Sequence, residues 1–253
     1  MIALLSALQS ENYRTAERLK LCGERKNSGK TEPGDGSADT GLQTEKWAGR
    51  TFRIGCLKGT PVVTGWTGTG TTPAGISCQY ICSRWRPEAV LFAGIGGALN
   101  PAYRTGEVVA AQEVLQWDLS AEALGIHAGI FPGEYTSEGK ALGGLEPDPV
   151  LLALVKKVSP FPVRQGRFLS GNSFVPPESA ALKGFSGDMV DMESIGVALA
   201  AYYNSIPCLI LRIVGDTAEG RPKNFRTFMD DASGKIADIF EAVLTEYKGN
   251  GSA

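Results

Sequence analysis

Short apolar runs that end in acidic or basic residues constrain the fold of this chain most. Cys208–Leu211 is typical of a buried strand, and Pro207 stands at its start, where a missing N–H is tolerated. Arg212 and Asp216 follow at its carboxyl end, where open α/β sheets collect their ligand-binding groups. Glu193 opens a helical pattern, so we expect it to lie beside the same edge of the sheet.

Other apolar runs alternate with helical patterns along the chain. Strands are predicted at Ile2–Leu5, Thr51–Leu57, Pro61–Trp66, Ala89–Ala93, Glu107–Trp117 and Val163–Leu169. Helices are predicted after Glu11 to near Cys22, from the loop at Thr67–Thr72 to about Trp85, and at Val150–Val158, Ser194–Ala201 and Asn224–Tyr247. This alternation indicates an α/β sandwich with a mixed or mostly parallel sheet, and we expect residues 1–253 to form a single domain.

One polar segment and two glycine-rich loops interrupt the pattern. Gly23–Lys46 has hardly any apolar residue to bury, so we predict an exposed insertion there. Thr67–Thr72 and Gly94–Leu99 are predicted loops in which backbone groups can approach a ligand closely, and Gly96 and Gly97 are candidate substrate-binding residues. Tight turns explain both loops about as well.

The composition, with 43% hydrophobic and 21% charged residues, is typical of a soluble globular protein. A formal net charge of −2 gives no electrostatic reason to expect nucleic acid or an anionic membrane as a partner. No apolar run approaches the ~18 residues that span a bilayer. Met1–Leu5 is too short for the apolar part of a signal peptide and has no basic residue before it.

Cysteine usage points to a reducing compartment. The five cysteines are odd in number and widely scattered, at Cys22, Cys56, Cys78, Cys82 and Cys208. A metal site needs further ligands, and His127 is the one histidine. We therefore predict buried free thiols, no metal and a cytoplasmic protein.

Four segments together resemble a known superfamily. They are Phe92–Leu99, Ser170–Val175, Val190–Glu193 and Arg212–Asp216. The chain resembles the nucleoside phosphorylases and nucleosidases, most closely the 5'-methylthioadenosine/S-adenosylhomocysteine nucleosidases. This resemblance implies a three-layer sandwich with a central mixed sheet flanked by helices, a small nucleoside as substrate, no cofactor and a homodimer.

The resemblance implies catalytic roles for three acidic residues. Asp216 matches the acid at N7 of the leaving adenine, Glu11 the base that activates water, and Glu193 the carboxylate that holds the ribose hydroxyls. These residue types suit the chemistry, because cleavage of an N-glycosidic bond builds positive charge on the sugar and negative charge on the base. From the residues alone, helix-capping carboxylates explain Glu193 and Asp216 equally well, and a solvated helix-start residue explains Glu11 better.

The resemblance also implies substrate-binding roles. Met192 matches a residue that packs under the sugar, and Phe174 a ring that stacks on the purine. Val175 matches a residue that offers backbone hydrogen bonds to the base edge, and Arg212 a basic residue that lines the ribose and water site. For an isolated phenylalanine such as Phe174, a place in the core is the default interpretation.

The chain departs from the family pattern at four positions. Ile95 stands in place of a small hydroxyl residue, Gly215 in place of a serine, Asp191 in place of a glutamate, and Trp117 in place of a histidine. These changes leave the reaction type standing but leave the nucleoside open.

Several functions therefore compete. The leading one is hydrolysis of adenine thionucleosides, and the alternatives are a purine nucleoside phosphorylase and a futalosine-type hydrolase. A phosphorylase should hold its anion with arginines near the glycine-rich loops, and Thr67–Thr72 contains none. A non-catalytic nucleoside-binding protein is a further alternative, against which the presence of three acidic candidates argues.

Overall fold

The fold is built on one mixed sheet. The computed structural model describes residues 1–22, 42–176, 179–182, 184–217, 220 and 222–247. Within them, the strands are β1 Ile2–Ser6, β2 Gln43–Trp47, β3 Arg50–Leu57, β4 Thr60–Trp66, β5 Ala89–Ala98, β6 Val108–Gln116, β7 Val163–Ser170, β8 Met189–Asp191 and β9 Cys208–Asp216. Their order is β2-β3-β4-β1-β5-β8-β7-β6-β9, and β9 also pairs with β5.

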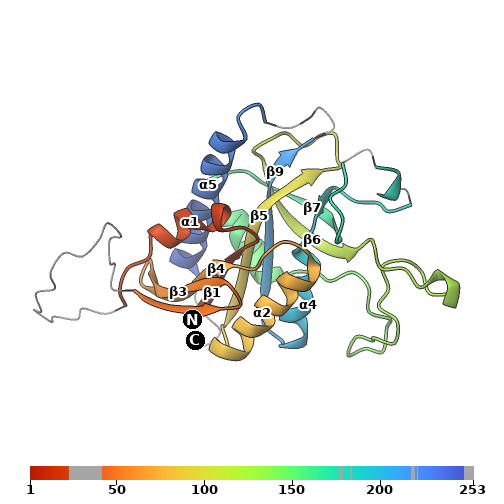
Figure 1. Cartoon of the computed structure of the whole chain (residues 1–253), viewed down its shortest axis with the longest axis horizontal. Helices are drawn as coiled ribbons and strands as arrows, with labels where there is room; N and C mark the ends of the chain where they lie inside the picture. The colour runs from red at the N-terminus through yellow and green to blue at the C-terminus, as the bar shows by residue number, and fades with distance from the viewer. Residues whose placement is uncertain (23–41, 177–178, 183, 218–219, 221, 248–253) are drawn as a thin grey trace, which may run out of the picture.

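Helices cover both faces of this sheet (Figure 1). They are α1 Gln9–Glu17, α2 Thr71–Trp85, α3 Pro149–Val158, α4 Ser194–Tyr203 and α5 Phe225–Glu246, with short 3-10 turns at Glu122–Leu124 and Ala180–Leu182. One core cluster joins one face of the sheet to α2 and α4, and a second joins the other face to α3 and α5. The protein is thus an α/β three-layer sandwich with a central mixed sheet, which confirms the predicted fold class.

The parallel strands at the centre decide where a ligand can bind. β1 pairs in parallel with β5, and β5 in parallel with β9. Their carboxyl ends therefore lie side by side, and the residues after these three strands meet at one edge of the sheet. These strands are buried along almost their whole length, as expected of parallel strands covered by helices on both faces.

Several predicted boundaries were wrong. Gly94–Ala98 continues β5 where we predicted a loop, because these residues pair with β9 and β8. Residues 43–46, assigned to the polar insertion, belong to β2, which pairs with β3. The first helix ends at Glu17, not near Cys22, and the short strand β8 was not predicted. Residues 23–41 of the predicted insertion lie outside the described residues.

The prediction that all five cysteines are free thiols was also wrong. Cys22 forms a disulfide with Cys56, across a sequence separation of 34 residues. Lys20 and Cys56 exchange two backbone hydrogen bonds beside it, at 2.7 and 2.9 Å, which brings the two cysteines together. Cys78, Cys82 and Cys208 are free and buried, as predicted. Two of the five cysteines are therefore oxidised, which weakens the prediction of a reducing compartment.

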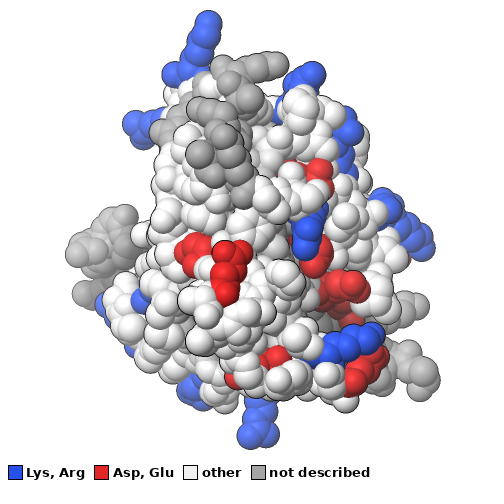
Figure 2. All heavy atoms as spheres, turned by 90° about the vertical axis from the view of Figure 1, so that its right-hand side faces the viewer, with Lys and Arg blue, Asp and Glu red and all other residues white. Residues whose placement is uncertain are grey.

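The described residues contain no helix long and apolar enough to cross a membrane. On the face shown in Figure 2, basic side chains lie mostly towards the outline and acidic ones nearer the middle, with uncharged surface between them.

Candidate active site

A cavity of about 250 Å³ lies at the carboxyl ends of the central parallel strands. Its lining includes eight of the nine residues that the sequence predicted, namely Glu11, Gly96, Gly97, Phe174, Val175, Met192, Glu193 and Asp216. The ninth, Arg212, is not among the lining residues, because its side chain is completely buried beneath the cavity. The cavity is also lined by residues that carry no signal in the sequence, among them Leu8, Phe225 and Met229.

Glu11 reaches the cavity from the first turn of α1. Its carboxylate accepts hydrogen bonds from the backbone N–H groups of Leu8 and Ile95, both at 2.8 Å. Only 3% of the residue is exposed, and this burial raises the pKa of Glu11, although the Arg212 charge opposes the shift. The contact with Ile95 ties α1 to β5, so a residue near the amino terminus is held at the carboxyl end of the sheet.

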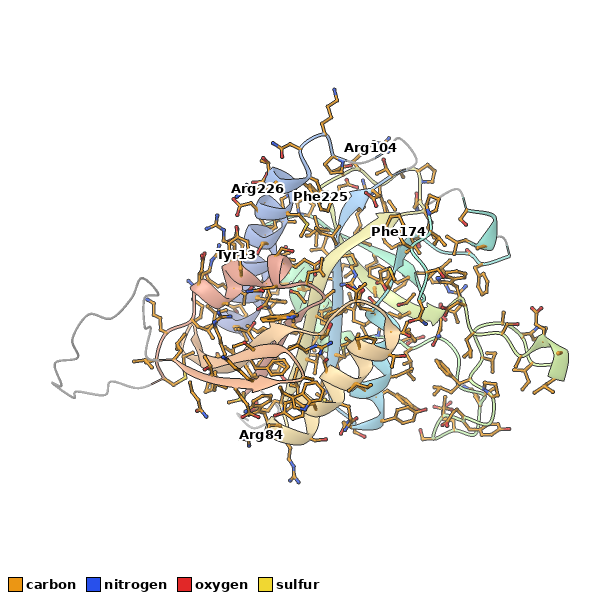
Figure 3. The ribbon with its side chains drawn as sticks, in the orientation of Figure 1. Tyr13, Arg84, Arg104, Phe174, Phe225 and Arg226 are labelled. Atoms are coloured by element: carbon orange, nitrogen blue, oxygen red, sulfur yellow. A yellow bond between two sulfur atoms is a disulfide. The ribbon has the colours of Figure 1, made fainter. Side chains whose placement is uncertain are left out.

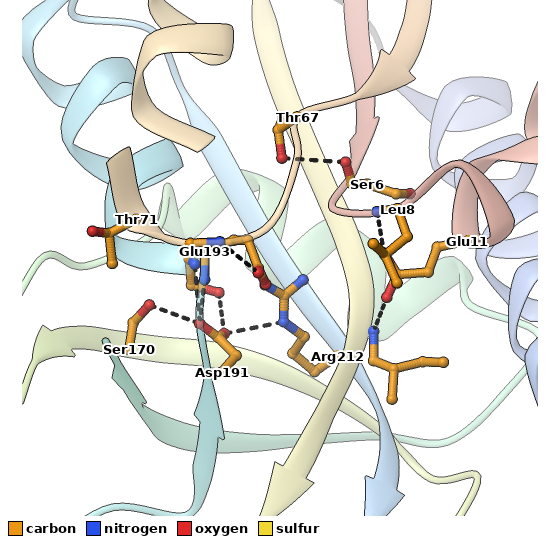
Figure 4. Close-up of polar contacts among 12 residues, drawn as sticks. Ser6, Leu8, Glu11, Thr67, Thr71, Ser170, Asp191, Glu193 and Arg212 are labelled. Atoms are coloured by element: carbon orange, nitrogen blue, oxygen red, sulfur yellow. Dashed lines mark hydrogen bonds and ion pairs between the residues drawn. The ribbon is translucent and has the colours of Figure 1, made fainter. Parts of the chain in front are cut away.

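Arg212 and Asp191 form a buried ion pair, of which Asp191 is among the residues that line the cavity (Figure 4). Arg212 Nε lies 3.0 Å from Asp191 Oδ2, and both side chains are almost inaccessible to solvent. Asp191 also accepts hydrogen bonds from the Ser170 and Ser194 hydroxyls and from backbone N–H groups at the start of α4. Burial alone would raise the pKa of Asp191, but Arg212 and the two hydroxyls outweigh it and hold the pKa below the ordinary value.

Glu193 also lines the cavity and contacts the same arginine. One oxygen accepts a hydrogen bond from the Gly70 N–H at 3.1 Å, and the other lies 3.4 Å from Arg212 Nη2. Burial raises the pKa of Glu193 to about 7, with Arg212 opposing the shift and the Asp191 charge adding to it. Glu193 can therefore exchange a proton near neutral pH. The loop at Thr67–Thr72, which sequence analysis singled out, supplies the N–H group that orients it.

Gly94 permits the close approach of Glu11 and Arg212. A Cβ at this position would lie 2.8 Å from Arg212 Nη1 and 2.9 Å from Glu11 Oε1. Nη1 is buried and has no hydrogen-bond partner among the described protein groups. Arg212 Nη1, a donor, and the Glu11 carboxylate thus adjoin the same small space next to Gly94. This arrangement can hold and polarise a small polar molecule such as water.

Phe174 lines the cavity from the loop after β7. It is 62% exposed, which rules out the default interpretation of a core residue. Asn172 fixes this loop: its backbone N–H donates to Asp118 at 2.6 Å, and its side-chain oxygen accepts from the Thr71 N–H and hydroxyl. Figure 3 shows Phe174 and Phe225 near the same end of β5, with Arg226 farther out on α5.

Comparison with known proteins agrees with this geometry. A family profile described as the phosphorylase superfamily matches residues 34–245. The chain belongs to the phosphorylase superfamily. Glu11 precedes the matched range, so the profile does not bear on it. The catalytic role predicted for Glu11 rests on the resemblance to nucleosidases, and its place in the cavity lining agrees with that role.

Individual members of the phosphorylase superfamily are similar over most of the chain. A 5'-methylthioadenosine/S-adenosylhomocysteine nucleosidase of Bacillus cytotoxicus is 30% identical over 216 residues, which cover 81% of this chain and 90% of that protein. The crystal structure of the corresponding Campylobacter jejuni nucleosidase matches with a TM-score of 0.82 at 22% identity, covering 97% of this chain and 99% of that one. The futalosine hydrolase of Helicobacter pylori matches with a TM-score of 0.79 at 18% identity, covering 97% and 98%. These two structures share the fold of this chain.

Proposed function

We propose that this protein hydrolyses the N-glycosidic bond of adenine thionucleosides, with methylthioadenosine and S-adenosylhomocysteine as substrates and adenine as the released base. The observation that carries the proposal is the convergence of Glu11, Glu193 and Asp216 on one cavity from three distant parts of the chain. The nucleosidase of Bacillus cytotoxicus, at 30% identity over most of its length, supports the choice of substrate class.

The proposed reaction uses these carboxyl groups in separate roles. Asp216 hydrogen-bonds or protonates N7 of the base as the bond between N9 and C1' breaks, and Glu11 takes a proton from the water that adds to C1'. Glu193 holds the ribose hydroxyls, and its negative charge favours the oxocarbenium-like sugar. Arg212 is buried and has two roles in this proposal. Its Nη2 orients Glu193, and its Nη1 faces the space beside Glu11.

The ring of Phe174 and the apolar floor of the cavity suit a purine and a sugar. Phe174 presents an exposed ring on which the base can stack, and Met192 lies in the lining beside Glu193. Gly96 and Gly97 contribute β5 backbone to the cavity lining. A Cβ at Gly96 would lie 3.2 Å from the Val190 carbonyl oxygen, so glycine at this position lets β8 pack closely against β5 beside the cavity.

The lining of the cavity favours hydrolysis over phosphorolysis. No arginine or lysine is among the described residues that line it, and a phosphate dianion needs such partners. Arg50, which approaches the Thr67–Thr72 loop, donates to the carbonyl oxygens of Thr67 and Ala48. A futalosine-type hydrolase remains the second candidate, because that Helicobacter pylori enzyme shares the fold over nearly the whole chain.

The direct test is a substrate panel scored for released base. Methylthioadenosine, S-adenosylhomocysteine, inosine and futalosine are incubated with the protein, with and without phosphate. Adenine release that does not depend on phosphate supports the proposal; phosphate-dependent sugar phosphate or release from futalosine alone would replace it with an alternative. Absence of base release from every nucleoside would favour a binding protein.

Two variants test the assigned roles. Asp216→Asn should lower base release by ~10²–10⁴-fold, as expected for loss of a general acid. Glu11→Gln should lower turnover by a similar factor while substrate affinity survives, because the amide keeps the shape but cannot take a proton. Turnover within a few fold of wild type in either variant would contradict the role given to that residue.

We also propose a homodimer in the cytoplasm. Exposed apolar side chains lie on helices α2 and α4, which pack against each other: Ile76 is 56%, Tyr202 38% and Tyr203 57% exposed. Exposed large apolar side chains on adjoining helices suit a protein interface. Light scattering of the purified protein tests the dimer, and a monomer at micromolar concentration would refute it. Cell fractionation tests the compartment.

A further inference from the structure

β9 contains an irregularity directly before Asp216. Gly96 is paired with Val214 and Gly97 with Asp216, so Gly215 has no partner residue on β5. An extra residue of this kind is a β-bulge, which bends the strand and changes the direction of the side chains beside it. The direction of Asp216 therefore depends on how the backbone at Gly215 is held.

Ile95 occupies the space next to Gly215. A Cβ added at Gly215 would lie 2.5 Å from Ile95 Cγ2, whereas the next nearest atom, on the Phe228 ring, would be 3.5 Å away. The first distance is a severe overlap and the second an ordinary contact. The φ angle of Gly215 is not positive, so the backbone itself would accept alanine. Among the described residues, Ile95 Cγ2 is thus the one close obstacle to a side chain at position 215, and a β-branched side chain has little freedom to rotate away.

The same residue holds the other catalytic candidate. The backbone N–H of Ile95 donates to Glu11 Oε1 at 2.8 Å, and its side chain is part of the cavity lining. One residue of β5 thereby contacts Glu11 through its backbone and the residue before Asp216 through its side chain.

We propose that Ile95 and Gly215 form one packing unit that fixes the bulge, and that Ile95 is a positioning residue that sets Asp216 relative to Glu11. The departures from the family pattern at Ile95 and Gly215 are then linked, because a branched residue at position 95 leaves no space for a side chain at position 215. This inference rests on the proposed function, because it takes Glu11 and Asp216 as the reacting carboxyl groups.

The test is a double-mutant cycle that combines Gly215→Ala with two substitutions at Ile95, one that removes Cγ2 and one that keeps it. Gly215→Ala should lower kcat about tenfold or more with little change in KM, because small misplacements of catalytic groups can cost up to ~10²-fold in rate. Ile95→Ala removes Cγ2 and should restore kcat in the double variant to that of Ile95→Ala alone. Ile95→Val keeps Cγ2, so it should fail to rescue Gly215→Ala. Gly234→Ala is the control, because a Cβ at Gly234 on α5 would meet no described atom within 4 Å apart from the adjoining helix backbone.

Either of two results would overturn the proposal: wild-type kcat in Gly215→Ala, or equal rescue by Ile95→Ala and Ile95→Val. If Gly215→Ala does not fold, the proposal requires that the double variant with Ile95→Ala folds and turns over, and its failure to do so counts against the proposal. If the wild-type protein cleaves no nucleoside, the proposed function fails on its own. In that case two other measurements test the packing unit. The changes in melting temperature caused by Gly215→Ala and Ile95→Ala should not add in the double variant, and crystal structures should show Asp216 displaced in Gly215→Ala but not in the double variant.

Discussion

Replacement of Glu193 by glutamine should change how the stability of this protein depends on pH. Burial raises the pKa of Glu193 in the folded protein to about 7, against an ordinary value of 4.5. Between pH 4.5 and about pH 7, the Glu193 carboxyl group keeps its proton in the folded state but has lost it in the unfolded state. The wild-type free energy of unfolding therefore falls as the pH rises from about 4.5 to 7 and is not affected further by this group above that range.

The size of the effect follows from the separation of the two pKa values. Each pH unit of separation is worth ~1.4 kcal/mol, so the whole difference amounts to about 3 kcal/mol. Most of it, roughly 2 to 3 kcal/mol, falls between pH 5 and pH 8, because the titration of the unfolded glutamate has begun by pH 5. Glutamine carries no titratable proton, so Glu193→Gln should gain roughly 2 to 3 kcal/mol relative to wild type over this interval. For a chain of this size, that gain corresponds to a relative rise in melting temperature of about 5–10 °C.

Urea unfolding of both proteins at pH 5 and pH 8 measures this quantity directly. Glu138→Gln is the control, because Glu138 is 71% exposed and its variant should keep the wild-type pH dependence. A difference between Glu193→Gln and wild type that is the same at both pH values would refute the reasoning about burial. In wild type, kcat/KM should fall as the pH drops below about 7, because the protonated form has lost the charge that the proposed reaction uses.

Two further predictions concern other parts of the structure. Gly94→Ala should lower base release by about 10²-fold, because its Cβ would lie within 3 Å of both Arg212 Nη1 and Glu11 Oε1; unchanged turnover, with Gly234→Ala as the control, would contradict the close approach of these groups. Reduction of the Cys22–Cys56 disulfide should lower the free energy of unfolding by about 4 kcal/mol, as chain entropy predicts for a loop of this length, and urea unfolding that is the same with and without a thiol reductant would contradict it.

The sequence by itself determined the fold class and singled out most of the residues proposed for the site. Apolar runs such as Cys208–Leu211 predict strands from local periodicity alone, and their carboxyl ends are where α/β sheets bind ligands. Asp216 and Glu193 could be singled out on this basis, since each adjoins an element that the pattern predicts. The resemblance to nucleosidases then added Glu11 and Phe174, whose local surroundings carry little signal.

Only the tertiary structure decided which of these residues meet and how each is held. The burial of Arg212 against Asp191, the Cys22–Cys56 disulfide and the contact between Ile95 and Gly215 all join segments that are far apart in sequence or lie on different elements. Local periodicity reports which face of a strand or helix is apolar, and it carries no information about which distant side chain fills the space opposite. Such pairings depend on close packing of the interior, where the shape of one side chain limits its neighbour. The pKa of Glu193 depends on the same packing, because burial and the nearby charges of Arg212 and Asp191 set it.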